Sequence, residues 1–260
     1  MLYFNKVGAG PPVVLVHGFP NDGSTWDTIL PLLSTGYQYI IPDLPGAGKS
    51  EPLAELSMEQ MARSVLEVLD HESIDKAIWV GHSMGGYTTL EAAQHFPERI
   101  QAISLVHSLA SGDNEEKLEA RRKSIKLLQN GDSGKSVFLR AMADNLFAKE
   151  FKTKHPEAVA TVADKGMELP ADTLAAFYNA IMLRSDKTEW LRTNNNIPVQ
   201  WIIGEEDNAT SMKEGLAQCY LAFLNEVQLY RSVGHMSMME TPKRLAKDLN
   251  SFFDFAWNRK

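Results

Sequence analysis

The sequence predicts an α/β fold: a mostly parallel, doubly wound sheet with an inserted helical cap. Short apolar runs rich in β-branched residues alternate with stretches of helical spacing, an order that builds parallel sheets through crossover helices. This alternation stops between 108 and 196, where one helical stretch follows another. The composition agrees, because 44% of the 260 residues are apolar and 23% are charged, as in globular proteins with a sizeable core.

The first part of the chain provides most of the predicted sheet. We expect strands over 2–6, 13–16, 37–41, 77–80 and 100–106, the first of them at an edge. Continuous apolar runs such as 13–16 are typical of strands buried on both faces. A short helix is expected near Trp26, another after Ser57, and a third after Ser83. Ser57 and Gln60 have the spacing of a capping box.

The rest of the chain divides into a cap and the end of the core. Helical spacing recurs near Leu118–Leu128, Val137–Phe147 and Leu174–Met182, in a segment too long to be a loop of a compact domain. Strands are then expected over 198–203 and 226–230, and helices over 211–223 and after Thr241. We therefore assign 1–107 and 197–260 to the core and 108–196 to the cap.

The charge pattern argues against two classes of partner. The net charge is −7 and no basic stripe offsets it, so we expect neither nucleic acid nor an anionic membrane surface to bind. The densest basic run, 121–123, follows several glutamates, which predicts a solvated helix face.

Compartment and assembly are predicted only broadly. The single cysteine, Cys219, fits a reducing compartment, and the first residues lack the pattern of a signal peptide. No apolar run has the length of a membrane span. We expect a cytoplasmic protein, either a monomer or a homodimer.

A glycine-bracketed serine is the centre of the chemistry. The stretch 81–86 reads Gly-His-Ser-Met-Gly-Gly between a predicted strand and a predicted helix, the context of a nucleophile elbow. A Cβ at Gly81 or Gly85 would press against the neighbouring strand and helix. Taken alone, the pentapeptide also fits an ordinary glycine-rich turn.

Two further residues join Ser83 at the same predicted edge. Asp207 and His235 also follow predicted strands, and the carboxyl ends of parallel strands meet at one edge of a sheet. The order Ser, Asp, His is the one expected for a hydrolase with a nucleophile elbow. An imidazole can take the proton of the serine, and a buried carboxylate fixes its tautomer.

A phosphate-binding loop is the less favoured interpretation of another stretch. Gly48-Lys49-Ser50 matches the end of a P-loop, but Asp43 stands where that pattern needs glycine and no helix follows directly. We interpret this stretch as a tight loop beside the site.

Five ordered motifs resemble the α/β-hydrolase superfamily over nearly the whole chain. They are His17-Gly18-Phe19, the loop from Asp43 to Ser50, the elbow at Ser83, Gly204-x-x-Asp207, and Gly234-His235. The resemblance implies Ser83 as nucleophile, His235 as base and then acid, and Asp207 as the orienting carboxylate. It also implies an oxyanion hole from the backbone N–H groups of Phe19 and Met84. The short segment before His17 departs from the family pattern, so the first antiparallel strands are expected to be reduced.

Other histidines and acids compete for these roles. By composition, His82 and His107 are alternative bases, whereas His17 is expected to shape the loop at Phe19. The acids that compete with Asp207 are Glu205, Glu206 and Asp113. We favour Asp207 because it stands at the third position after Gly204.

A covered, mostly apolar pocket is expected under the cap. Its candidate lining residues are Trp26, His107, Phe138, Phe147, Phe177, Tyr178 and Met236. We see no obvious charged clamp for an acidic substrate. The resemblance is strongest to small capped carboxylesterases and to cofactor-free haloperoxidases or perhydrolases, which implies small or medium, largely apolar esters as substrates. No cofactor or metal is expected. A carbon–carbon bond hydrolase with the same triad and a non-catalytic ligand receptor are the alternatives.

Overall fold

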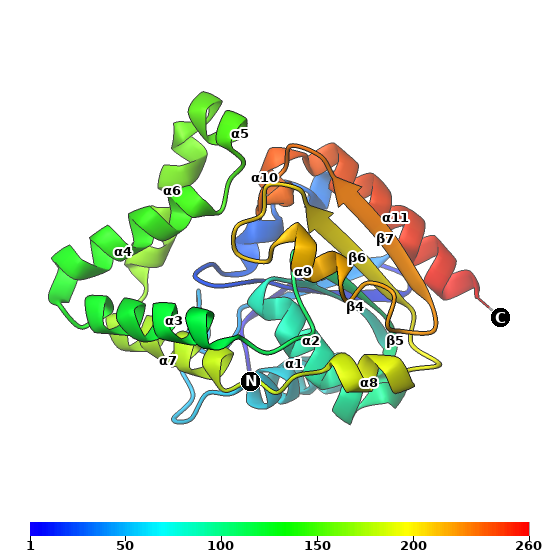
Figure 1. The fold of residues 1–260 in the computed structure, drawn as a ribbon. Helices are drawn as coiled ribbons and strands as arrows, with labels where there is room; N and C mark the ends of the chain where they lie inside the picture. The colour runs from blue at the N-terminus through cyan, green and yellow to red at the C-terminus, as the bar shows by residue number, and fades with distance from the viewer. Residues whose placement is uncertain (260) are drawn as a thin grey trace.

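A seven-stranded sheet lies at the centre of the structure, a computed structural model that describes residues 1–259 (Figure 1). In spatial order its strands are β1 (Phe4–Gly8), β3 (Gln38–Pro42), β2 (Pro12–Val16), β4 (Ala77–His82), β5 (Ile100–Val106), β6 (Val199–Gly204) and β7 (Asn225–Tyr230). β1 pairs antiparallel with β3, and every other pairing in the sheet is parallel. The predicted fold class is confirmed, and the antiparallel part of the described sheet is reduced to β1.

Apolar layers cover both faces of this sheet. Successive residues of a strand point to opposite faces. Accordingly, Val14 and Val16 of β2 pack in one cluster with α1 (Met58–His71) and α2 (Met84–His95). Val13 and Leu15 pack in the other cluster with α11 (Pro242–Asn258), which follows the short helix α10 (Ser237–Glu240). The central strands are therefore buried on both faces, as their continuous apolar runs predict.

Two predicted helices are shorter in the structure. The stretch near Trp26 forms two 3₁₀ turns, Gly23–Trp26 and Leu30–Leu32, because Pro31 cannot continue an α-helical hydrogen-bond ladder. The helix expected over 211–223 is limited to α9 (Met212–Leu216), after which the chain continues in turns. The capping box at Ser57 is half formed: its side chain accepts from the Gln60 N–H, but Gln60 Oε1 has no partner among the described residues.

Six helices lie between β5 and β6. They are α3 (Glu115–Leu128), α4 (Gly131–Asn145), α5 (Lys149–Lys154), α6 (Pro156–Glu168), α7 (Ala171–Met182) and α8 (Thr188–Thr193). α3 packs against α7, and α4 packs against α6. In Figure 1, α4, α5 and α6 form an arm beside the sheet. Within residues 1–259, no helix combines the length and hydropathy needed to cross a bilayer.

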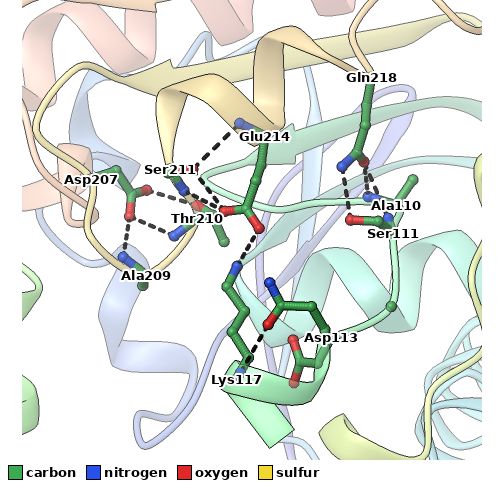
Figure 2. Close-up of polar contacts among 12 residues, drawn as sticks. Ala110, Ser111, Asp113, Lys117, Asp207, Ala209, Thr210, Ser211, Glu214 and Gln218 are labelled. Atoms are coloured by element: carbon green, nitrogen blue, oxygen red, sulfur yellow. Dashed lines mark hydrogen bonds and ion pairs between the residues drawn. The ribbon is translucent and has the colours of Figure 1, made fainter. Parts of the chain in front are cut away.

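Hydrogen bonds tie the start of this helical segment to the loop and helix after β6 (Figure 2). The side chain of Gln218 accepts from the backbone N–H of Ala110 and of Ser111, at 2.7 and 3.1 Å. Lys117 of α3 donates to Glu214 of α9 at 2.6 Å. These contacts fix the position of α3 relative to the sheet. They therefore determine which side chains of α3 lie near the carboxyl edge of the sheet.

Candidate active site

Ser83 lies in a strained turn between β4 and α2. Its φ is 51°, in the left-handed region that side-chain-bearing residues seldom adopt. Its N–H donates to the carbonyl of Val106 at 3.0 Å, and Ser108 Oγ donates to the Ser83 carbonyl at 2.8 Å. The neighbouring strand β5 and the residue after its end therefore hold the turn in place.

Glycines make this turn sterically possible. A Cβ at Gly81 would overlap the backbone of Gly85, and a Cβ at Gly85 would overlap the carbonyl oxygen of Val16 in β2. A Cβ at Gly18 would be 2.9 Å from the Cβ of Ser83. The predicted reason for the elbow glycines is confirmed, and the loop that carries Phe19 lies directly against the elbow.

His235 and Asp207 form a buried pair. The ring nitrogen Nδ1 of His235 donates to Asp207 Oδ2 at 2.8 Å, and both side chains are almost fully buried. The other donors to Asp207 are the N–H groups of Ala209 and Thr210 and the hydroxyl of Thr210, each at 2.8 Å (Figure 2). Four donors thus orient the carboxylate. With its proton fixed on Nδ1, the imidazole keeps an unprotonated Nε2.

The charge of Asp207 is stabilised by its neighbours. Burial alone raises the pKa of a carboxyl group, but attraction to the His235 and His107 imidazoles outweighs it, and the pKa of Asp207 lies well below its ordinary value. Asp207 is therefore ionised at any pH at which an imidazole can act as a base.

His107 is the second imidazole beside Asp207. Its Nδ1 lies 3.2 Å from Asp207 Oδ2, yet neither of its ring nitrogens forms a well-aligned hydrogen bond within residues 1–259. The ligand atoms of His107, Asp207 and His235 lie within 4.8 Å of one another, so by distance this trio could hold a metal ion. A cation there would have to displace hydrogen bonds that Asp207 already accepts.

The other two histidines of this region contact the backbone of neighbouring loops. His82 is 1% exposed and its Nε2 lies 3.0 Å from the carbonyl oxygen of His235. His17 is fully buried; its Nε2 accepts from the Leu44 N–H at 2.9 Å and its Nδ1 donates to Gly18. His17 therefore links the ends of β2 and β3, in line with the predicted role in the loop at Phe19.

The loop that carries His235 is anchored to the segment after α4. The His235 N–H donates to the carbonyl of Leu146 at 2.6 Å. The carboxylate of Glu240 accepts from three N–H groups, those of Gly234, Met236 and Ala148, at 3.0 to 3.1 Å. Two segments far apart in sequence thus share one partly buried acceptor next to His235.

Replacing Glu240 with glutamine is expected to destabilise the protein. Both carboxylate oxygens of Glu240 accept backbone N–H groups, whereas a glutamine amide has only one acceptor oxygen. The N–H groups that face the NH₂ of the amide would lose their acceptor. The expected loss is about 1–3 kcal/mol in the free energy of unfolding, measured by urea denaturation. Ester turnover should also fall several-fold because His235 loses support on both sides. Glu168→Gln, at an exposed ion pair, is the matched control. Equal stability of Glu240→Gln and wild type would contradict this role.

A pocket of about 80 Å³ joins Ser83 and His235. Its lining residues come from the sheet edge, from α2 and from the helices after β5: Phe19, Ser83, Tyr87, Arg121, Met142, Leu146, Tyr178, Ile181, Ala209, Thr210 and His235. A larger groove, of about 590 Å³, lies at the amino ends of β5 and β6 and contains none of these residues. Because chemistry in parallel sheets is located at the carboxyl edge, the smaller pocket is the candidate site.

The predicted pocket residues have different positions. Tyr178 lines the pocket. Phe138 and Phe177 lie behind it, with ring centroids 6.4 and 6.2 Å from that of Phe19. Phe138 also lines a second pocket, which shares Tyr178 with the first.

The remaining predicted pocket residues lie outside this lining. Trp26, Phe147 and Met236 belong to the apolar cluster on the α11 face of the sheet. His107 lies behind His235, with ring centroids 5.7 Å apart.

Arg121 is a pocket residue that the sequence did not reveal. The expectation that 121–123 forms a solvated face is wrong for Arg121, whose side chain is 21% exposed and turned into the pocket. Arg122 is 47% exposed and pairs with Glu115, as expected. Consecutive helical residues point about 100° apart, so one of the two can face inward.

The N–H groups of Phe19 and Met84 border the elbow. Met84 is the first residue of α2, where backbone N–H groups have no partner within the helix. Among residues 1–259, neither of these two N–H groups donates to another protein group. Both N–H groups are thus left without a protein acceptor next to the elbow.

Three buried imidazoles make stability depend on pH. Burial lowers the pKa of His17, His82 and His107 below 6.5, against the opposing attraction of Asp43 and Asp207. Below pH 6.5 the unfolded chain therefore binds protons that the folded chain does not, and the free energy of unfolding falls as the pH falls. Each imidazole contributes up to about 1.4 kcal/mol per pH unit, so we expect a loss of about 2–4 kcal/mol between pH 7 and 5.5.

Urea denaturation at several pH values measures this loss. His107→Asn should reduce the slope between pH 7 and 5.5, because one buried imidazole is removed at a left-handed position that asparagine tolerates. His155→Gln, at an exposed histidine, should leave the slope unchanged. A free energy of unfolding that stays constant over this range would contradict the prediction.

A strand, a strained serine and a helix, with a histidine–aspartate pair at the same sheet edge, define the class of α/β proteins built on a nucleophile elbow. A family model described as the alpha/beta hydrolase fold matches residues 11–242. The chain therefore belongs to the alpha/beta hydrolase family, and the predicted resemblance is confirmed.

A solved structure and two curated relatives extend this comparison. An esterase from Thermogutta terrifontis, solved with malate bound, superposes with a TM-score of 0.91 at 26% identity over 98% of this chain and 93% of that chain. The acetyltransferase component of an acetoin cleaving system from Pseudomonas putida is 40% identical over 40% of this chain and 28% of its own length. A pimeloyl-[acyl-carrier protein] methyl ester esterase from Citrobacter koseri is 38% identical over 37% of this chain and 36% of its own length. The chain thus covers about a third of these curated relatives.

Proposed function

We propose that the protein is a serine hydrolase that cleaves carboxylic esters through an acyl-enzyme. The observation that carries this proposal is the pocket shared by Ser83 and His235, with His235 hydrogen-bonded to the buried carboxylate of Asp207. Ser83 is the nucleophile, His235 is the base and then the acid, and Asp207 fixes the imidazole tautomer. The similarity to proteins named as esterases supports this choice.

The reaction follows from these positions. Ser83 Oγ attacks the ester carbonyl and its proton passes to His235 Nε2; the tetrahedral intermediate collapses and the leaving alcohol takes that proton. Water then attacks the acyl-enzyme, again giving its proton to His235, and the acid is released with Ser83 restored. Within the described residues no direct hydrogen bond joins Ser83 Oγ to His235. Such bonds are often long without substrate and tighten when it binds.

The oxyanion hole of this proposal uses Phe19 and Met84. Their N–H groups have no protein acceptor in residues 1–259 and border Ser83 on two sides. Donors that are already in place where negative charge develops usually give the largest electrostatic contribution to acyl transfer.

The helical segment 108–196 acts in this proposal as a cap on the core, 1–107 with 197–260. Helices α3, α4 and α7 supply Arg121, Met142, Tyr178 and Ile181 to the pocket. The small volume of the pocket favours short acyl groups, and a small-molecule ester is the proposed substrate.

Labelling with a fluorophosphonate tests the proposal directly. Such a reagent reacts with an activated serine, so we expect one label per wild-type chain, located at Ser83 by peptide mass spectrometry. p-Nitrophenyl esters from acetate to long acyl chains should show the highest turnover at the short end. Folded protein that neither takes the label nor hydrolyses any of these esters would refute the proposal, and carbon–carbon bond cleavage or ligand reception would be tested next.

A further inference from the structure

The pocket beside Ser83 contains a permanent positive charge. Among the residues that line it, Arg121 is the only side chain charged at every working pH, and no carboxylate is part of the lining. Lys117, one turn earlier on α3, is tied to Glu214 and holds this part of the helix against α9 (Figure 2). Arg121 therefore faces the pocket from an anchored helix.

The buried charges behind this wall do not balance. Asp113 is 1% exposed; it accepts from Arg121 Nε at 2.6 Å and from an Arg184 guanidinium nitrogen at 2.8 Å. One carboxylate thus serves two guanidinium groups, and Arg184 is itself only 4% exposed. Burying an unbalanced charge is costly unless a counter-ion pairs with it. Arg121 and Arg184 together therefore carry one more charge than Asp113 balances.

Arg121 is the guanidinium of this cluster that lines the pocket; Arg184, whose buried Nε also has no partner among the described residues, is not part of the lining. Arg184 also donates to the carbonyls of Ile181 and Ser111, so its guanidinium is used to hold the chain. The terminal N–H groups of Arg121 form no well-aligned hydrogen bond within residues 1–259, although they approach the Tyr178 hydroxyl. A planar guanidinium whose two terminal nitrogens are free matches a carboxylate, which it can bind in a bidentate manner.

The neighbouring phenol does not neutralise this charge. The Arg121 guanidinium lies 5.0 Å from the centroid of the Tyr178 ring. Burial, with a smaller opposing effect of Arg121, raises the pKa of Tyr178 to about 12. Tyr178 therefore stays uncharged and can donate a hydrogen bond to an anion held by Arg121.

We propose that Arg121 binds a free carboxylate of the substrate, so that the preferred substrates are short esters that carry a second, ionised carboxyl group. Hemiesters of short dicarboxylic acids are the simplest members of this class. The pocket of about 80 Å³ favours short members of this class. This inference rests on the proposed ester hydrolysis at Ser83, and it corrects the expectation of a pocket without a charged clamp.

Matched pairs of esters test the inference. Monomethyl succinate and methyl butyrate differ mainly in a carboxylate that replaces a methyl group, and monomethyl malonate with methyl propionate forms a shorter pair. We expect wild type to favour at least one hemiester over its neutral partner by tenfold or more in kcat/KM. Arg121→Gln should lower that ratio by about 10- to 100-fold, mainly through KM, and Arg121→Lys should restore part of it. Arg122→Gln, at the exposed neighbour, should leave it unchanged. A ratio that Arg121→Gln does not alter would overturn the inference.

Binding of succinate separates this inference from the ester reaction. Ser83→Ala protein should bind succinate in a calorimetric titration, and the double variant with Arg121→Gln should lose that binding by tenfold or more. If no ester is hydrolysed but succinate binds through Arg121, the proposed hydrolysis fails and the carboxylate site stands. If methyl butyrate is hydrolysed but neither succinate binding nor hemiester preference depends on Arg121, the carboxylate site is refuted and the hydrolase proposal stands.

Discussion

Replacing Ser83 with alanine is expected to lower kcat for ester hydrolysis by roughly 10⁴- to 10⁶-fold. The change removes the hydroxyl that stands at the strained turn in the pocket of His235, next to the free N–H groups of Phe19 and Met84. Thr210 also lines this pocket, but its hydroxyl already donates to Asp207. The other lining hydroxyls are the phenols of Tyr87 and Tyr178, which do not lie at the elbow.

Stability should change little in this variant, which keeps the interpretation simple. Ser83 Oγ forms no hydrogen bond within residues 1–259, and the contacts that hold the turn use its backbone. Alanine keeps the same Cβ at the same left-handed φ. We therefore expect an unfolding midpoint close to that of wild type, with Ser251→Ala, at an exposed serine of α11, as control. Near-normal turnover by folded Ser83→Ala would show that another group performs the chemistry.

The sequence was informative wherever backbone geometry dictates the residue. At the elbow, Gly81 and Gly85 are required because a side chain there would overlap a neighbouring backbone. The continuous apolar run 13–16 likewise indicated a strand with both faces covered. These features depend on local sterics and on side-chain periodicity, which a single sequence displays.

Other features depend on contacts between distant segments. Pro31 limits the stretch after Trp26 to 3₁₀ turns, and Gln218 bonds to the loop after β5 where a longer helix was expected. α5 and α8 have six residues each, too few for a periodic pattern to be recognised.

The position of Arg121 in the pocket likewise depends on contacts between distant segments, which the sequence does not display. Its sequence neighbours are charged, so local composition indicates solvent, and only the packing of α3 against α7 decides which face of the helix is turned inward. Asp113, weighed as a competing triad acid, stands eight residues before Arg121 and is its ion-pair partner. Asp113 is one of several acids before this basic run, so its position in the sequence did not identify it as the partner of Arg121.

Replacing Asp207 with asparagine is expected to lower kcat by roughly 10⁴-fold with little change in KM, because the imidazole would adopt the wrong tautomer. The N–H groups of Ala209 and Thr210 both point at Oδ1, so the asparagine oxygen must occupy that position and its NH₂ must face His235. An NH₂ at that position donates a hydrogen bond, and Nδ1 of His235 can accept it only when Nδ1 carries no proton. The proton of the imidazole then moves to Nε2, where it blocks the base function toward Ser83.

Steady-state kinetics with a short p-nitrophenyl ester measure this effect, and the competing acids provide the controls. Glu206→Gln alters a neighbouring carboxylate that accepts from the Lys149 N–H, and it should keep most of the activity. Asp113→Asn should affect esters with a free carboxylate more than neutral ones, since Asp113 holds Arg121 rather than His235. If Asp207→Asn retained wild-type kcat while either of these variants lost it, the orienting carboxylate would have been misassigned. Both His107 and His235 lie beside Asp207, but only His235 shares the pocket with Ser83, which is why the proposed reaction uses His235 as its base.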